Sequence, residues 1–70
     1  MDGTTQRIAD RLRTIRTEKG FTQGEVAEKA AINTNYYAKV ERGETTASIP
    51  MLEKIADVLG VDISEIFSNK

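Results

Sequence analysis

Residues 23–42 read QGEVAEKAAINTNYYAKVER, and this stretch decides the fold. Its apolar spacing predicts two short helices, from about Gln23 to Ala30 and from Thr34 to about Glu41, with only three residues between them. Helices joined by so short a turn cross at a steep angle, which requires small residues where the backbones meet and apolar residues beside the turn. The residues that meet this requirement are Val26, Ala27, Ala30, Ile32, Tyr37 and Val40. The pattern is that of a helix-turn-helix.

Cap residues place the ends of these helices and of their neighbours. The predicted N-caps are Thr22, Asn33, Ser48 and Asp62, and the predicted stops are Gly20, Gly43 and Gly60. Thr22 and Asp62 are each followed three residues later by a glutamate, Glu25 and Glu65, which predicts two capping boxes.

Three more helices are predicted around the pair, one before it at about residues 5–19 and two after it at about 49–59 and 62–67. Their predicted inward residues are Ile8, Leu12 and Ile15, then Ile49, Leu52, Ile55, Ala56 and Leu59, and finally Ile63, Ile66 and Phe67. Phe21 is expected in the core between the first two helices. No segment alternates with period two for long enough to make a strand, so the fold class is all-α with five helices.

The composition excludes several classes of function. The chain has 70 residues, enough for one small domain, and contains neither cysteine nor histidine. It therefore lacks the commonest general base and the commonest zinc ligands, and it has no phosphate-binding loop. We expect no enzyme, no metal, no cofactor and no small-molecule ligand. No apolar run approaches the roughly 18 residues of a membrane span, and the N-terminus is no signal peptide, so we expect a cytoplasmic protein without a membrane partner.

The net charge of −1 argues neither for nor against a polyanionic partner. Its distribution is uneven, because eight of the ten lysines and arginines lie in the first 45 residues. The remaining part of the chain is acidic. This asymmetry suits a molecule with one basic face.

The stretch from about Ile8 to Phe67 resembles the Cro/repressor-type (XRE-like) helix-turn-helix family. The likeness rests on Thr22-Gln23, Val26-Ala27, Val40-Glu41-Arg42-Gly43 and Leu59-Gly60-Val61. It implies a compact five-helix bundle of the lambda-repressor-like type, a single DNA-binding domain over residues 1–70 with an ordered core at about 5–67. The chain departs from the family at Ala31, where a glycine is usual in the turn. If Ala31 adopts positive φ, the strain is of order 1 kcal/mol.

The second helix of the motif is expected to carry the function. With Tyr37 inward, its outward face holds Asn35, Ala38, Lys39 and Arg42, with Thr34 beside them and Asn33 at the leading end. Such side chains can read base edges in the major groove of double-stranded DNA, asparagine pairing with adenine and lysine with guanine. The resemblance implies base contacts from Asn33, Thr34, Asn35 and Lys39. The alternative is a solvated face without a ligand.

Phosphate contacts are predicted at the edges of that face. The resemblance implies one from Gln23, whose side chain would also bridge toward the second helix of the motif. Tyr36 and Arg42 are further candidates, although Tyr36 could instead pack against the following helix. Arg7, Arg11 and Arg13 are most simply a solvated face.

Two further contacts are predicted. The resemblance pairs Arg16 with Glu41 as a structural ion pair at the edge of the core, so neither belongs to the binding surface. Ile63, Ile66 and Phe67 either close the core or form a homodimer interface, and Val58 is expected to be exposed in a monomer.

The first hypothesis is a sequence-specific DNA-binding regulator that binds a two-fold operator as a dimer. Its size fits a phage or plasmid repressor, an antitoxin or the controller of a restriction–modification operon. The second is a small helical protein-interaction module that keeps the fold without reading DNA. Salt-dependent binding to DNA separates the two.

Overall fold

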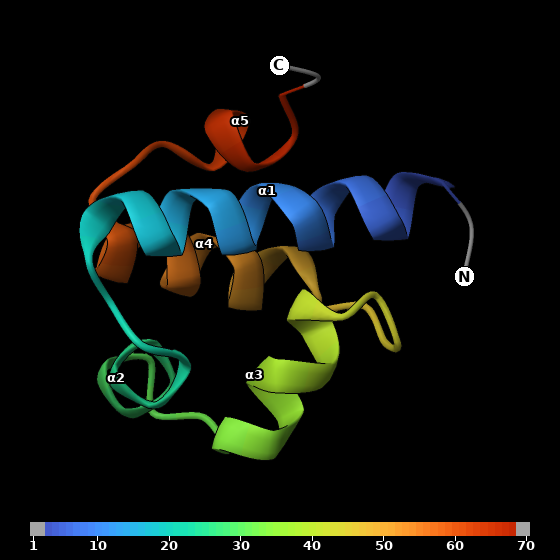
Figure 1. Cartoon of the computed structure of the whole chain (residues 1–70). Coiled ribbons are helices and arrows are strands. Elements are labelled where there is room, and N and C mark those ends of the chain that lie inside the picture. Colours follow the sequence, from blue (N-terminus) through green and yellow to red (C-terminus); the bar gives the residue numbers. More distant parts are fainter. Residues whose placement is uncertain (1–2, 69–70) are drawn as a thin grey trace.

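The computed structural model describes residues 3–68 and contains five helices in the predicted order. They are α1 (Gly3–Lys19), α2 (Gln23–Lys29), α3 (Thr34–Glu41), α4 (Ile49–Leu59) and α5 (Ile63–Ile66). No strand occurs in these residues, so the all-α class is confirmed. Figure 1 shows α1 running across the molecule next to α4, with α2 and α3 on one side of α1 and α5 on the other. None of the helices within residues 3–68 has the length and apolar character that a membrane crossing needs.

Side-chain caps start three of the helices. The capping box before α2 is complete: the Thr22 hydroxyl accepts from the Glu25 N–H at 3.1 Å, and the Glu25 carboxylate accepts from the Thr22 N–H at 2.8 Å. Ser48 caps α4 by accepting from the Met51 N–H at 3.2 Å. The second predicted capping box is wrong, because the Asp62 side chain makes no cap hydrogen bond. Helix α5 is a single turn, held at its start by the bond from the Glu65 N–H to the Asp62 carbonyl at 3.0 Å.

The turn between α2 and α3 takes the geometry that the short connection demands. Ala31 has φ +59°, so the left-handed conformation is adopted by alanine where glycine would be unstrained. The Ala31 N–H donates to the Glu28 carbonyl at 3.0 Å, and the Ile32 N–H donates to the Ala27 carbonyl at 2.9 Å. These two bonds form a Schellman motif, which satisfies the last carbonyls of α2. The departure at Ala31 therefore costs about 1 kcal/mol of strain without changing the type of turn.

The core lies where α1, α2, α3 and α4 meet, and α5 closes one end of it. Its buried members are Leu12, Ile15, Val26, Ala27, Ala30, Tyr37, Val40, Leu52, Ile55, Ala56, Leu59 and Ile66. Five of the six residues predicted to set the helix crossing belong to this cluster, and Ile32 packs against it half-buried. Because burying a large apolar side chain stabilises by about 1.5–3 kcal/mol, these contacts fix how α3 is presented.

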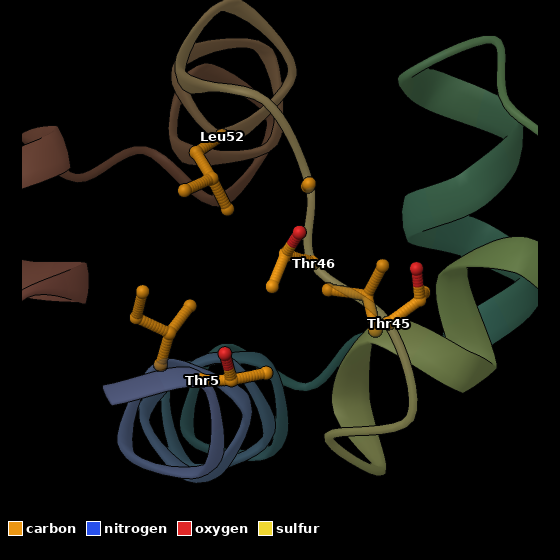
Figure 2. Close-up of a pocket in the computed structure, with 7 residues that line it drawn as sticks. Thr5, Thr45, Thr46 and Leu52 are labelled. Carbon is orange, nitrogen blue, oxygen red and sulfur yellow. The ribbon is translucent and has the colours of Figure 1, made fainter. Parts of the chain in front are cut away.

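Two apolar residues that were predicted inward are exposed, whereas Ile8, Phe21 and Ile63 are half-buried against the core. Ile49, expected in the buried stripe of α4, is 54% exposed. It is the first residue of α4. Leu52, one turn later, lines a small cavity together with Thr45 and Thr46 of the preceding loop, as Figure 2 shows. Phe67 follows the last turn of α5 and is 39% exposed. The core therefore ends before both residues.

Candidate nucleic-acid interface

The outward face of α3 carries three polar side chains that nothing else in the fold uses. Thr34, Asn35 and Lys39 are exposed, and none of them makes a side-chain hydrogen bond within residues 3–68. An exposed helix face with free donors and acceptors has the size and chemistry that a major groove accommodates. Three of the four predicted base-contacting residues therefore lie together on an exposed face, with side chains that are not engaged elsewhere in residues 3–68.

Asn33, the fourth, has a structural task as well. Its side-chain oxygen accepts from the backbone N–H groups of Asn35 at 2.8 Å and Tyr36 at 3.2 Å, which caps α3. The carbonyl is thus engaged, while the amide NH₂ remains able to donate. A bidentate pairing of Asn33 with adenine, which needs both groups, would require the cap to break.

Ala38 was predicted on the outward face of α3, and this prediction is wrong. Only 9% of this residue is exposed, and it belongs to the buried side of α3 together with Tyr37 and Glu41. Ala38 is therefore not part of the exposed face of α3.

A buried ion pair holds the far end of α3 against α1. The Arg16 guanidinium donates from Nε to one Glu41 oxygen at 2.6 Å and from Nη2 to the other at 3.1 Å, so the predicted ion pair forms and is bidentate. The Glu41 side chain is 1% exposed and that of Arg16 13% exposed. Arg16 also donates to the Phe21 carbonyl at 2.8 Å, which adds the connection between α1 and α2 to the network. Glu41 thus lies in the core, deeper than the edge position expected from its spacing.

Gln23 joins this network from α2. Its side-chain amide donates to Glu41 Oε1 at 3.2 Å, which matches the bridge toward α3 that the family resemblance implied. Gln23 occupies the first position of α2, where backbone N–H groups lack acceptors within the helix. One carboxylate therefore ties the last turn of α1, the start of α2 and the end of α3 together.

Tyr37 lies against the same network. Its hydroxyl is buried and has no hydrogen-bond partner within the described residues. Burial raises the pKa of Tyr37 well above its ordinary value, and the neighbouring Glu41 carboxylate raises this pKa further. The pairing with Glu41 likewise raises the pKa of Arg16. The site is consequently held by one charged pair beside a neutral phenol.

The other two predicted phosphate contacts already have protein partners. The Tyr36 hydroxyl donates to the Thr46 carbonyl at 3.4 Å, and the ring packs half-buried against the core. This corresponds to the packing alternative, directed at the loop before α4. Arg42 is exposed and donates to Glu44 from Nε at 2.7 Å and from Nη2 at 3.3 Å. Each side chain would have to give up a bond to meet a phosphate with the same atoms.

Two pairings of cations were missed at the sequence level. Arg11 was assigned to a solvated face, yet its Nε donates to the Glu65 carbonyl at 3.0 Å and so fastens α5 to α1. Residues 11 and 65 are far apart in sequence, so no local pattern connects them. The pairing of Arg42 with Glu44 was also missed, although opposite charges flanking Gly43 were a visible signal. Arg7 and Arg13 do lie on an exposed face, where Arg13 pairs with Asp10 at 2.9 Å.

The predicted dimer residues separate into two groups. Ile66 is 0% exposed and belongs to the core, so it is not available for an interface. Phe67 is exposed and Ile63 is half-buried. Val58, expected to be exposed, is half-buried because it packs against the core cluster. The apolar surface left near α5 is smaller than predicted and centres on Phe67.

The hollows of the surface are small or open. Figure 2 shows a cavity between the first turns of α1 and α4, with Thr46 of the intervening loop beside it. Its volume is about 20 Å³, roughly the room of one water molecule. A shallow depression of about 260 Å³ lies where α4 leads into α5 and is lined by Glu53, Ala56, Asp57, Val61, Asp62 and Ile63. Among residues 3–68 no three metal-binding side chains converge.

Comparison with known families gives one clear match. The sequence model of the HTH_3 family, described as helix-turn-helix, matches residues 12–66. The chain is also similar to the HTH-type transcriptional regulator SinR of Bacillus subtilis (strain 168), with 38% identity over 64 residues. That alignment covers 90% of this chain and 58% of SinR. The chain therefore spans little more than half the length of this relative.

Solved structures agree with the sequence match. The restriction-modification controller protein C.AhdI from Aeromonas hydrophila superposes with a TM-score of 0.87 at 32% identity, covering 90% of this chain and 96% of that one. SinR in complex with DNA superposes with a TM-score of 0.82 at 37% identity, covering 87% of this chain and 98% of that one.

Proposed function

The chain belongs to the helix-turn-helix family, and from this we propose that it is a sequence-specific transcriptional regulator that binds DNA through the outward face of α3. One observation carries the proposal: Thr34, Asn35 and Lys39 are exposed and free on a helix whose inner face is fixed by a buried ion pair. A reading surface must be held rigid while its side chains stay unengaged, and α3 meets both conditions. The resemblance to SinR, which has been solved with DNA, supports the same conclusion.

The exposed residues have distinct chemical capacities. Asn35 offers an acceptor and a donor side by side, which matches the N6 and N7 edge of adenine. Lys39 offers an ammonium group, which matches O6 and N7 of guanine. Thr34 can donate or accept, and Asn33 can donate while it still caps α3. This set can discriminate bases at a few positions of a half-site.

Phosphate contacts would fix the register of α3 on the duplex. Gln23 suits this role because it sits at the start of α2 and is itself fixed by Glu41. Arg42 lies at the opposite end of the reading helix and supplies a positive charge. Tyr36 contributes only if its hydroxyl leaves the Thr46 carbonyl. Gln23 and Arg42 are therefore the principal candidates.

We further propose that two copies bind a two-fold operator. A domain of this size reads only a few base pairs, and paired half-sites about 34–36 Å apart extend the reading. The apolar surface for such a contact comes from Ile63, which is half-buried at the start of α5, and from Phe67, which is exposed just after α5. This surface is separate from the outward face of α3, so pairing would leave the reading face uncovered.

The alternative, a protein-interaction module that does not read DNA, has less support. The characterised relatives are transcriptional regulators and controller proteins, and one of them has been solved with DNA. By the same analogy we infer a repressor or a small operon controller. Such a protein acts where bacterial DNA lies, in the cytoplasm.

Selection of bound fragments from a random DNA pool tests the proposal. We expect a consensus with two-fold symmetry. A plot of log K for binding to this consensus against log salt concentration should have a slope of about −0.9 per phosphate contact. Recovery of no consensus, together with binding that does not depend on salt, would favour the interaction module. A consensus without symmetry would remove the dimer and keep the DNA-binding function.

A further inference from the structure

The turn that ends α3 holds an acidic residue close to the two cations of the reading helix. Gly43 has φ +76°, and its N–H donates to the Val40 carbonyl at 3.1 Å. The next N–H, that of Glu44, donates to the Lys39 carbonyl at 3.0 Å, which completes a Schellman motif. The Gln6 side chain covers Gly43 where any Cβ would lie. The backbone of Glu44 is therefore fixed beside the last turn of α3.

The Glu44 side chain uses this position to engage Arg42. Its two oxygens accept from Arg42 Nε at 2.7 Å and Nη2 at 3.3 Å, so one edge of the guanidinium is fully occupied. Both side chains are about half exposed. The hydrogen bond from Arg42 lowers the pKa of Glu44, and the charge of Lys39 contributes in the same direction. Glu44 is thus a carboxylate at neutral pH, and it offsets one of the two positive charges at this end of α3.

A phosphate would meet Arg42 along the same edge. Carboxylate and phosphate both present two oxygens that match the Nε and Nη2 donors, so they compete for this fork. We propose that Glu44 is a positioning residue that holds Arg42 away from DNA phosphate in the free protein and so weakens binding to DNA of every sequence. The inference rests on the proposed DNA-binding function. Because phosphate contacts carry no sequence information, the cognate and the unrelated duplex should be affected by the same factor.

The size of the effect follows from counterion release. Each phosphate neutralised adds about 0.9 to the slope of log K against log salt. When one phosphate contact is added, the affinity therefore rises by an additional factor of about eight between 1 M and 0.1 M salt. An exposed ion pair is weak, so Glu44 attenuates the contact and does not abolish it.

The test substitutes Glu44→Gln, which keeps the shape and removes the charge. Binding is measured by fluorescence anisotropy between 50 and 300 mM salt, on the selected consensus duplex and on an unrelated duplex of equal length. We expect both affinities to rise, by at most about eightfold at 0.1 M salt, and the salt slope to steepen by at most about 0.9. Glu44→Asp, which keeps the charge, should stay close to the original protein. Glu53→Gln on α4 controls for the change in net charge and should give a much smaller gain.

A double variant isolates the role of Arg42. In an Arg42→Gln background, Glu44→Gln should bring no more gain than Glu53→Gln does. An equal gain with and without Arg42 would show general repulsion and overturn the competition. A loss of affinity in Glu44→Gln would also overturn it, since Glu44 would then orient Arg42 toward DNA. If the original protein binds neither duplex at 50 mM salt, the proposed function fails and the inference fails with it.

Discussion

Replacement of Glu41 by alanine tests how α3 is held. The Glu41 carboxylate accepts two bonds from Arg16 and one from Gln23, and its side chain is 1% exposed. Removing it leaves the Arg16 guanidinium largely buried, with only the Phe21 carbonyl as an acceptor within the described residues. Breaking a buried pair from one side costs about 3–5 kcal/mol, and the slight exposure of Arg16 favours the lower end.

This loss is large relative to the whole domain. A chain of this length has a free energy of unfolding of roughly 4–10 kcal/mol. At roughly 4–8 °C per kcal/mol, a loss of about 3 kcal/mol lowers the melting temperature by about 12–24 °C. Far-UV circular dichroism during heating, together with urea unfolding at pH 7, measures both quantities. Glu53→Ala, at an exposed position of α4, is the matched control and should melt close to the original protein.

A compensating variant separates charge burial from packing. Arg16→Met with Glu41→Leu replaces the pair by apolar side chains of similar size, and such replacements are often neutral or stabilising. The double variant should therefore recover most of the stability that Glu41→Ala loses. If Glu41→Ala melted within about 2 °C of the original protein, the network would not hold α3 and the reasoning would be refuted.

Five other substitutions have distinct expected outcomes. Ala31→Gly should raise stability by about 0.5–1 kcal/mol in urea unfolding, because glycine relieves the left-handed strain; a drop would contradict that assignment. Because the pKa of Tyr37 is raised in the folded protein, its phenol stays protonated there, whereas in the unfolded chain it ionises near pH 10. The free energy of unfolding therefore keeps its full value below about pH 10 and falls above it. Tyr37→Phe should lose little or nothing at neutral pH and remove this part of the alkaline loss, as melts from pH 7 to 11 would reveal. Asn33→Ala should lower the free energy of unfolding by about 1 kcal/mol, because the cap of α3 is lost. The Lys39→Ala variant should keep its melting temperature and lose about 1–3 kcal/mol of discrimination at one base position. Phe67→Ser should shift sedimentation equilibrium toward the monomer with melting nearly unchanged, and an unchanged dimer would place the interface elsewhere.

Local rules predicted the fold well because its decisive features are local. Thr22, Asn33 and Ser48 lie one step before their helices, so a cap could be assigned from a few neighbouring residues. The same rule failed at Asp62, since a single-turn helix offers its cap only a backbone bond. Ala31, by contrast, could be singled out only through the family resemblance, because a glycine is usual at this position of the turn.

Predictions failed where burial depends on a distant segment. Ile49 follows the helical spacing of α4, yet it is the first residue of that helix and is exposed. Ile66 shares a face with Phe67 in sequence terms, but one is covered by the bundle and the other is not. The bond from Arg11 to the Glu65 carbonyl joins segments that no local pattern connects. Periodicity identifies a face and does not tell how far along it the core extends.

The candidate site was predicted in outline and corrected in chemistry. The exposed polar residues of α3 were predicted because an outward polar face follows from placing Tyr37 inward. Two details required coordinates: the side-chain oxygen of Asn33 is engaged in capping, and Arg42 is occupied by Glu44. The first detail occupies an acceptor and the second occupies two donors that could otherwise meet DNA.

The central claim is that α3 reads bases, and Asn35 tests it most directly because its side chain has no structural task within residues 3–68. Selection from the same random pool should be carried out with the original protein and with Asn35→Ala, after circular dichroism shows equal melting. The account predicts a two-fold consensus for the original protein and the loss of preference at one position of each half-site for the variant. An identical consensus from both proteins would contradict it.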